Sequence, residues 1–246
     1  MLKLLAPAKI NLALDVLSRR NDGYHDVDMV MQPLTLADEI LWEPAMEIEL
    51  SCQNPQVPLN RQNLAWKAAE LLQRKYDVKQ GVKITIQKNI PVAAGLAGGS
   101  TDAAAVLTGL NRLWDLKLSR EELMELGVQL GADVPFCILQ QTARAQGIGE
   151  VLTPLQIGLD CRVLLITPNI GVSTALVYQQ LVVAEIKRHP GIDQVITGLE
   201  QGDLDRLVTY WGNVLEEVVF PRYPQVKQLK EVLKRHGAVH RLMSGS

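Results

Sequence analysis

The stretch "IPVAAGLAGGSTDAA", residues 90–104, places four small or hydroxyl residues, Gly98 to Thr101, directly ahead of Asp102 and an alanine run. Glycines let the backbone approach an anion closely and accept positive φ. Successive amide groups can form an anion nest, and a helix that follows presents its positive N-terminal end. The hydroxyls of Ser100 and Thr101 are available to such an anion or to its metal ion. The stretch is therefore a candidate cradle for phosphate.

A plainer interpretation of the same stretch is a glycine-rich turn, capped by Ser, Thr or Asp at the start of a helix. The stretch has neither the G-x-x-x-x-G-K-[ST] spacing of the common P-loop nor the G-x-G-x-x-G spacing. Short motifs of this kind produce false positives. Taken alone, residues 90–104 leave the two interpretations evenly balanced.

The periodicity of apolar residues in the first half indicates both strands and helices. Alternation predicts strands at 9–17, 46–52 and 82–87. Helical spacing predicts one helix that begins after Asn63, placed as its N-cap, and another over 103–114.

The second half is predicted to be richer in helices. Ser119 and Glu122 have the spacing of a capping box, for a helix that ends at Gly131. "GADVPFCI", residues 131–138, reads as loop and extended structure, and "GLDCRVLLITP", residues 158–168, as a buried strand. Further helices are expected at about 173–183, at 203–216 behind an Asp203 cap, and at 224–236. Strands and helices intermix without strict βαβ alternation, which favours an α+β fold in two domains, 1–157 and 158–246.

The composition limits the class of protein. The chain has 246 residues, 47% of them hydrophobic and 21% charged, and a net charge of −2, so it has no basic surface for nucleic acid or an anionic membrane. Its three cysteines are widely spaced, which argues against a disulfide framework and against a metal site. Lys9, Asn11 and Asp15 interrupt the apolar N-terminus, unlike a signal peptide. A soluble, cytoplasmic protein is expected.

Two further stretches contain candidate functional residues. "PAKINLALDVLSRRNDGYHDVDMVM" covers residues 7–31, and "LGADVPFCI" covers 130–138. In isolation, Lys9 and Asn11 would be solvated residues of an edge strand, and Tyr24 and His25 would flank a turn. Asp133 would be a turn or cap aspartate.

Taken in chain order, "PAKINL", "GYH", residues 90–104 and "GADVPF" resemble the GHMP family of small-molecule kinases, which includes galacto-, homoserine, mevalonate and phosphomevalonate kinases. The resemblance is most specific over residues 1–155. It implies an N-terminal strand–helix domain, a ferredoxin-like C-terminal domain and a site in the cleft between them. It also implies ATP-dependent phosphorylation of a small molecule, so that the glycine stretch is a phosphate cradle.

The stretch "RNDGYHDVDMVMQPLTLAD", residues 20–38, narrows the resemblance to the members that phosphorylate the tertiary 2-hydroxyl of a cytidine diphosphate derivative of methylerythritol, in the non-mevalonate isoprenoid pathway. The alternatives are another GHMP kinase, acting on homoserine or phosphomevalonate, and a nucleotide-binding form without activity. The last alternative arises because "HRLMSGS", residues 240–246, stops inside a third glycine-rich motif of the family, which implies a missing C-terminal tail. Gln140 and Gln141 stand where the family has a glycine-containing turn.

The resemblance assigns the chemistry to two side chains. Asp133 would be the base that takes the hydroxyl proton. Lys9 would hold that carboxylate ionised and stabilise charge on the attacking oxygen. ATP phosphates would lie over 94–102, with Asn63 and Lys88 near the adenosine. The implied nucleotide-binding residues are Asn63, Lys88, Pro91, Ala94, Gly95, Leu96, Ala97, Gly98, Gly99, Ser100, Thr101 and Asp102.

The resemblance assigns the substrate to a second group of residues, which includes Asp133. Asn11 would contact substrate or nucleotide near the reacting centre. Tyr24 would stack on the cytosine, His25 would hydrogen-bond its edge, and Tyr178 would close the other side of the ring. Mg²⁺ is expected with ATP, and no carboxylate is assigned to it. We expect a small-molecule partner, no nucleic acid or membrane, and a monomer or homodimer.

Overall fold

The computed structural model describes residues 2–157, 160–168 and 170–245. The chain forms two compact units, and its first two strands, β1 (Leu2–Arg19) and β2 (His25–Ala45), contribute to both. The first unit consists of Met1–Lys9 and Pro33–Gln140, and the second of Ile10–Gln32 and Gln141–Ser246. The domain boundary predicted at 157/158 lies beside residues 158–159, which are outside the described residues, and it stays a prediction.

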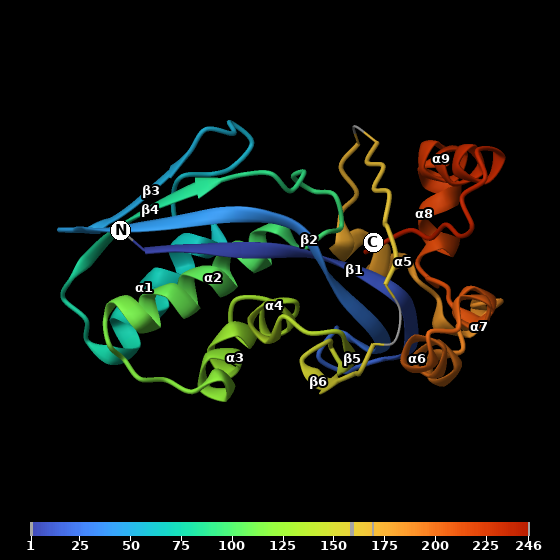
Figure 1. Ribbon diagram of the computed structural model, residues 1–246, viewed down its shortest axis with the longest axis horizontal. Helices are drawn as coiled ribbons and strands as arrows, with labels where there is room; N and C mark the ends of the chain where they lie inside the picture. Colours follow the sequence, from blue (N-terminus) through green and yellow to red (C-terminus); the bar gives the residue numbers. More distant parts are fainter. Residues whose placement is uncertain (1, 158–159, 169, 246) are drawn as a thin grey trace. The chain divides into compact units, whose positions relative to one another are not determined.

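In the first unit, β2 pairs antiparallel with β4 (Gly81–Gln87), from Glu39 opposite Gln87 to Ala45 opposite Gly81. The strand β3 (Ile48–Cys52) pairs parallel with β4. The helices of this unit are α1 (Leu64–Tyr76), α2 (Gly98–Leu113), α3 (Arg120–Val128) and α4 (Val134–Leu139). Figure 1 shows them gathered on one side of the strands, so the sheet and the helices form two layers.

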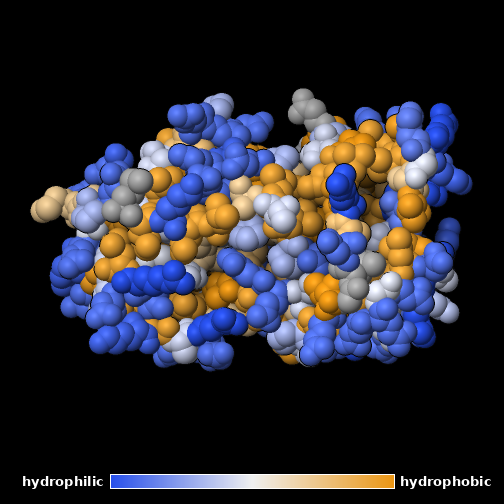
Figure 2. Space-filling view, in the orientation of Figure 1, coloured by the Kyte–Doolittle hydropathy of each residue, from blue (hydrophilic) through white to orange (hydrophobic). Residues whose placement is uncertain are grey.

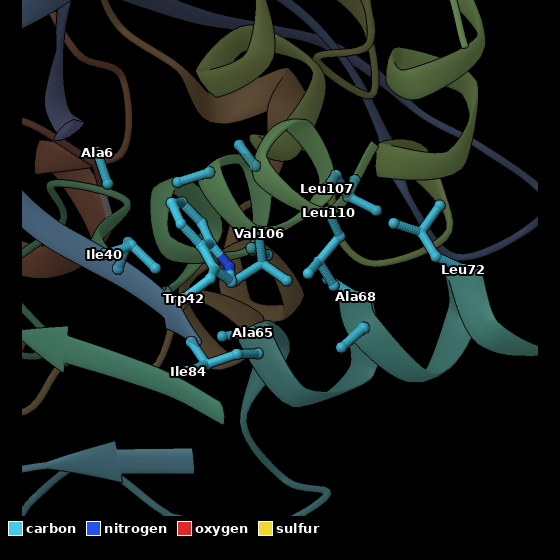
Figure 3. Close-up of a cluster of buried hydrophobic side chains, with 14 of the residues drawn as sticks. Ala6, Ile40, Trp42, Ala65, Ala68, Leu72, Ile84, Val106, Leu107 and Leu110 are labelled. Carbon is cyan, nitrogen blue, oxygen red and sulfur yellow. The ribbon is translucent and has the colours of Figure 1, made fainter. Parts of the chain in front are cut away.

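The core of the first unit lies between these layers. Trp42 on β2 is buried against α2, where a side chain on Gly109 would come within 2.5 Å of the indole ring. Figure 3 shows the indole beside Val106, and Ala65 and Ala68 of α1 belong to the same cluster. Small residues on the helices let them approach the sheet closely. Burying a large apolar side chain contributes roughly 1.5–3 kcal/mol, so this packing fixes the position of α2.

In the second unit, the first half of β2 pairs with β5 (Ala143–Gly147), which pairs with β6 (Val151–Pro154). Beyond β6 the named elements in the described residues are helical: α5 (Thr174–Gln180), the 3₁₀ turn Val183–Glu185, α6 (Ile192–Gln201), α7 (Leu204–Tyr210), α8 (Glu216–Arg222) and α9 (Pro224–Arg235). Ala13 and Val30 of the N-terminal strands pack with Ile192 and Val195 of α6 in one buried cluster.

Several sequence-based predictions are confirmed. The α+β class holds, and the strands predicted at 9–17, 46–52 and 82–87 lie in β1, β3 and β4. The Asn63 side chain caps α1, and the capping box of Ser119 and Glu122 begins α3, although that helix ends at Val128, before Gly131. None of the described helices has the length and apolar character needed to cross a membrane.

Three local predictions are wrong. Residues 134–139 form α4 instead of a loop, because proline fits the first helical turn and the helix buries Val134, Phe136 and Cys137. The described part of 158–168 forms no strand, and Leu164 is 72% exposed. An isolated strand is unstable without hydrogen-bonded neighbours. The helix predicted at 203–216 is interrupted after Tyr210, where the Gly212 carbonyl accepts a bond from the Leu14 amide, 2.8 Å away.

Several apolar residues of this C-terminal region are exposed. Figure 2 shows hydrophobic colour over the part of the surface that Figure 1 draws in yellow and orange. Val163, Leu164 and Ile166 are exposed within the predicted strand, and Leu176 and Val182 follow. An apolar run in the sequence therefore does not correspond to a buried strand here.

Candidate active site

The loop before α2 leads into a helix without a side-chain cap in the described structure. Its N-cap residue is Ala97, in a left-handed conformation with φ of 57°, and the alanine side chain has no oxygen that could accept a capping bond. By contrast, the Asn63 Oδ1 accepts a bond from the Ala65 amide at 2.8 Å in α1. The first amides of a helix have no intrahelical acceptor. The N-terminus of α2 therefore presents donors that suit an anion.

The glycines of this loop do not share one role. Positive φ is found at Gly95, but also at Ala93 and Ala97, whereas Gly98 and Gly99 lie inside α2 without it. The sequence-based expectation that these glycines supply positive φ thus holds for Gly95 alone. Left-handed alanines are unfavourable, and strain of this kind is found at ligand-binding loops.

Gly98 and Gly99 differ in what a side chain would meet. A Cβ on Gly98 would lie 3.1 Å from the Lys88 ammonium and 3.3 Å from Ile90. A Cβ on Gly99 would have a single neighbour within 4 Å among the described residues, Leu64 at 3.8 Å. Gly98 is therefore in close contact with Lys88 and Ile90. At Gly99, by contrast, the backbone at the start of the helix has open space beside it.

Lys9 and Asp133 form an ion pair in the same unit. The distance from the Lys9 Nζ to the Asp133 Oδ2 is 3.7 Å, and the two side chains are 6% and 35% exposed. The Lys9 amide also donates to the Leu96 carbonyl at 3.1 Å, which ties β1 to the loop. Lys9 is thus a buried cation, and not the solvated edge residue that its position in a strand suggested.

Asp133 occupies the N-cap position of α4, yet its carboxylate makes no capping bond in the described structure. Only its carbonyl is used, as the acceptor for the Cys137 amide at 3.1 Å. The interpretation of Asp133 as a cap aspartate is therefore not supported, and its carboxylate is available for chemistry. Burial raises the pKa of the neighbouring Cys137 thiol, so this thiol stays protonated and is a poor nucleophile.

Lys88 lies below the loop in a buried network with two carboxylates. Its ammonium pairs with Asp38 and, at 2.9 Å, with the Asp102 Oδ2. The other oxygen of Asp38 accepts bonds from the amides of Asn89 at 2.6 Å and Ile90 at 2.8 Å. Sequence reasoning missed Asp38. It ends the stretch 20–38, but no role was assigned to it there, and its partners are distant in the chain.

The pKa of Asp102 in this network is higher than that of an ordinary aspartate. Burial raises its pKa to about 7, against the attraction of Lys88 and together with the charge of Asp38. Its Oδ1 is buried and lacks a hydrogen-bond partner among the described residues. Because the pKa is higher than the ordinary value of 3.8, the folded state binds this proton more tightly than the unfolded state does.

The Asp102→Asn variant is expected to change how stability depends on pH. In the wild type, the contribution of Asp102 favours folding below its ordinary pKa and is lost as the pH rises toward about 7. The variant lacks this loss, so between about pH 5 and about pH 8 its free energy of unfolding should rise relative to that of the wild type by roughly 2–3 kcal/mol, at about 1.4 kcal/mol per pKa unit. Urea unfolding of both proteins between about pH 5 and about pH 8 measures the difference. A constant difference across this range would contradict the assignment.

In the second unit, the rings of His25 and Tyr178 lie near each other, while the cytosine contacts expected of them stay predictions. Their ring centroids are 5.4 Å apart, and the exposed ring of Tyr24 precedes His25 in the chain. Burial, with the nearby charge of Arg19, lowers the pKa of His25, so the imidazole is neutral at neutral pH. Its Nε2 is buried without a hydrogen-bond partner in the described structure. These features suit the polar edge of a flat heterocycle.

Asn11 and Asn63 have structural contacts of their own. The Asn11 Oδ1 accepts a bond from the Gly245 amide at 3.2 Å, and the backbone N–H of Asn11 donates to the Ser244 hydroxyl at 3.1 Å. The Asn63 side chain caps α1 and donates to the Pro58 carbonyl at 2.9 Å. The binding roles expected for both residues stay predictions.

Comparison with known proteins agrees with this geometry. Residues 63–141, which include the loop, α2 and Asp133, match the model of the GHMP kinases N terminal domain. This match places residues 63–141 in the N-terminal domain of the GHMP kinases.

Individual relatives are more specific. A 4-diphosphocytidyl-2-C-methyl-D-erythritol kinase from Geobacillus sp. (strain WCH70) is 52% identical over 243 residues, which cover 98% of this chain and 84% of the relative. The one from Geobacillus thermodenitrificans (strain NG80-2) is 50% identical over 248 residues, with 100% and 85% covered. A crystal structure of 4-(cytidine 5'-diphospho)-2C-methyl-D-erythritol kinase, 35% identical, superposes with a TM-score of 0.80 over 99% of this chain and 87% of that one. The chain belongs to the 4-diphosphocytidyl-2-C-methyl-D-erythritol kinase family.

Proposed function

We propose that this chain transfers the γ-phosphoryl group of ATP to the 2-hydroxyl of 4-diphosphocytidyl-2-C-methyl-D-erythritol, in the cytoplasm. The observation that supports this most directly is the ion pair of Lys9 and Asp133, whose lysine is bonded to the loop before the uncapped helix α2. This pair belongs to a chain about half identical to kinases of that name.

The ATP phosphates would be held by the loop and the first turn of α2. The donors are backbone amides over 94–102, with Pro91 at the entry of the loop, and the bare backbone of Gly99 permits a close approach. The helix dipole favours the negative charge of the phosphates. The residues present therefore fit a polyphosphate.

A magnesium ion would accompany the nucleotide. Among the described residues, no three His, Cys, Asp or Glu side chains come together as a metal site. Mg²⁺ is commonly held by substrate phosphates and few protein groups. The oxygens that fit it here are the hydroxyls of Ser100 and Thr101, of which the Thr101 Oγ1 is buried without a partner among the described residues. When bound, the ion neutralises charge on the β- and γ-phosphates.

The transfer itself would use Asp133 and Lys9. The Asp133 carboxylate accepts the proton of the substrate hydroxyl while the oxygen forms its bond to the γ-phosphorus and the bond to the ADP oxygen breaks. The ammonium of Lys9 stabilises negative charge on the attacking oxygen. Phosphoryl transfer depends mainly on positioning and on neutralising charge, which such a pair provides.

The cytidine group would be recognised by residues of the second unit. The exposed Tyr24 ring offers a stacking surface, Tyr178 a second one, and the neutral His25 imidazole a hydrogen bond for the cytosine edge. Asn11 would contribute near the reacting centre.

The test is ATP consumption with 4-diphosphocytidyl-2-C-methyl-D-erythritol, beside homoserine and phosphomevalonate as competing acceptors. Turnover with the cytidyl substrate alone is expected. Turnover with homoserine or phosphomevalonate alone would assign another GHMP activity. Binding of ATP without turnover on any acceptor would favour a nucleotide-binding form without activity. Light scattering on the same preparation distinguishes the monomer from the homodimer.

A further inference from the structure

The buried network of Asp38, Lys88 and Asp102 is not used by the chemistry proposed above. All three side chains are at most 5% exposed, and Lys88 contacts both carboxylates. We call these three residues the Lys88 network. Replacing a buried ion pair by apolar residues is often neutral or stabilising, so such a network is weak evidence for stability alone. Its location suggests a more specific role.

The Lys88 network connects the two ends of the phosphate loop. At the entry, Asp38 Oδ1 accepts the amides of Asn89 and Ile90, which fixes the backbone where β4 ends. At the exit, Lys88 pairs with Asp102 in the first two turns of α2. One strand residue, Asp38, thus holds the loop entry directly and the helix start through Lys88.

The Lys88 side chain also packs against Gly98, the first residue of α2. Its ammonium is 3.1 Å from the position that a Cβ on Gly98 would take. With 5% of its side chain exposed and two carboxylates bound, Lys88 is oriented into the protein beneath the loop. The left-handed residues Ala93 and Ala97 lie between the two anchored ends. Such unfavourable conformations persist only where the surroundings hold them in place.

We propose that Asp38 and Lys88 are positioning residues, which hold the loop over 89–102 in the shape that binds ATP phosphates. This proposal rests on the proposed function, and it gives Lys88 a role beneath the loop in place of the nucleotide contact expected from the sequence. Loss of either residue loosens one end of the loop and misaligns the amides at the start of α2.

The test combines amide hydrogen exchange with nucleotide affinity, in the full chain. The variants are Lys88→Met and Asp38→Asn. The matched control is Glu39→Gln, which removes a carboxylate from the next position of β2, where Glu39 pairs with the exposed Lys3 at 2.7 Å. Asp102→Asn is the conservative variant, because its amide oxygen still accepts a bond from Lys88. The nucleotide probe is a non-hydrolysable ATP analogue with Mg²⁺.

In Lys88→Met, peptides over 89–102 are expected to exchange about tenfold faster, while the peptide over α1 stays within about twofold of the wild type. The Kd of the ATP analogue should rise about 10- to 100-fold, because small misplacements of a binding site have effects of that size. The KM of the cytidyl substrate should change less than about twofold. Glu39→Gln should match the wild type throughout, and Asp102→Asn should keep the slow exchange over 89–102.

Two results would overturn the proposal. One is exchange over 89–102 and nucleotide affinity both within about twofold of the wild type. The other is equal acceleration in the loop and in α1, which would show a general role in stability. If Lys88→Met does not fold, Asp38→Asn, which preserves side-chain size, is judged by the same criteria. A wild-type chain that does not bind the ATP analogue would refute the proposed function, and the exchange data would still decide the role of the Lys88 network.

Discussion

Replacing Asp133 with asparagine is expected to lower kcat by about 10²- to 10⁴-fold, the usual contribution of a positioned general base. Asparagine has the same shape but cannot accept the hydroxyl proton. Some stability should also be lost, because the carboxylate is the ion-pair partner of the buried Lys9 ammonium, although it makes no capping bond in the described structure. Steady-state kinetics with ATP and the cytidyl substrate, together with a thermal melt, measure both quantities.

A second N-cap aspartate provides the control. The Asp203 carboxylate does cap its helix, accepting a bond from the Arg206 amide at 2.9 Å. Asp203→Ala should therefore cost about 1 kcal/mol of stability and leave kcat unchanged. Turnover of Asp133→Asn at the wild-type rate would remove Asp133 from the chemistry. A loss of stability with kcat unchanged would reduce the Lys9–Asp133 pair to a structural role.

Gly99→Ala is expected to weaken ATP binding by about 10²-fold without destabilising the chain. The added methyl group meets only Leu64 at 3.8 Å among the described residues, and alanine is favoured over glycine in a helix by roughly 0.5–1 kcal/mol. The methyl group would occupy the space through which phosphate approaches the first turn, and a shift of about 1 Å there is enough for an effect of this size. Titration with the ATP analogue measures the affinity, and urea unfolding measures the stability.

Gly212→Ala is the matched control for the loss of a glycine. Its new Cβ would make an ordinary contact of 3.6 Å with Pro190, far along the chain from the loop. This variant should bind the ATP analogue as the wild type does. Unchanged affinity in Gly99→Ala would show that the phosphates do not lie over the start of α2.

Local sequence signals predicted the elements that local physics determines. The capping box of Ser119 and Glu122 and the cap Asn63 each depend on contacts within a few residues, and both are present. Residues 131–138 were predicted as loop and extended structure, whereas burial of Phe136 and its neighbours favours the helix α4. The apolar run at 158–168 was misread because pairing partners, which periodicity cannot reveal, decide whether a strand forms.

The candidate site was predictable only in part, because some of its contacts join residues that are distant in the sequence. Lys9, Asp133 and the loop lie in motifs, so the resemblance indicated them, and the structure pairs Lys9 with Asp133. Asp38 ends the stretch 20–38, yet its role could not be predicted from that stretch, since its partner Lys88 lies 50 positions away in the sequence. Sequence alone also could not show that Ala93 and Ala97, rather than Gly98 and Gly99, adopt the left-handed conformation.

The contribution of β1 and β2 to both units has a consequence for the order in which the chain folds during synthesis. The segments of the first unit end at Gln140, so that unit can form while the ribosome is still translating the rest. Ala13 and Val30 must instead wait for Ile192 and Val195, which emerge more than a hundred residues later. Contacts so distant in sequence slow folding. A fragment beginning at residue 158 would lack Ala13 and Val30, and its newly made helices would have an apolar face with no strand to cover it.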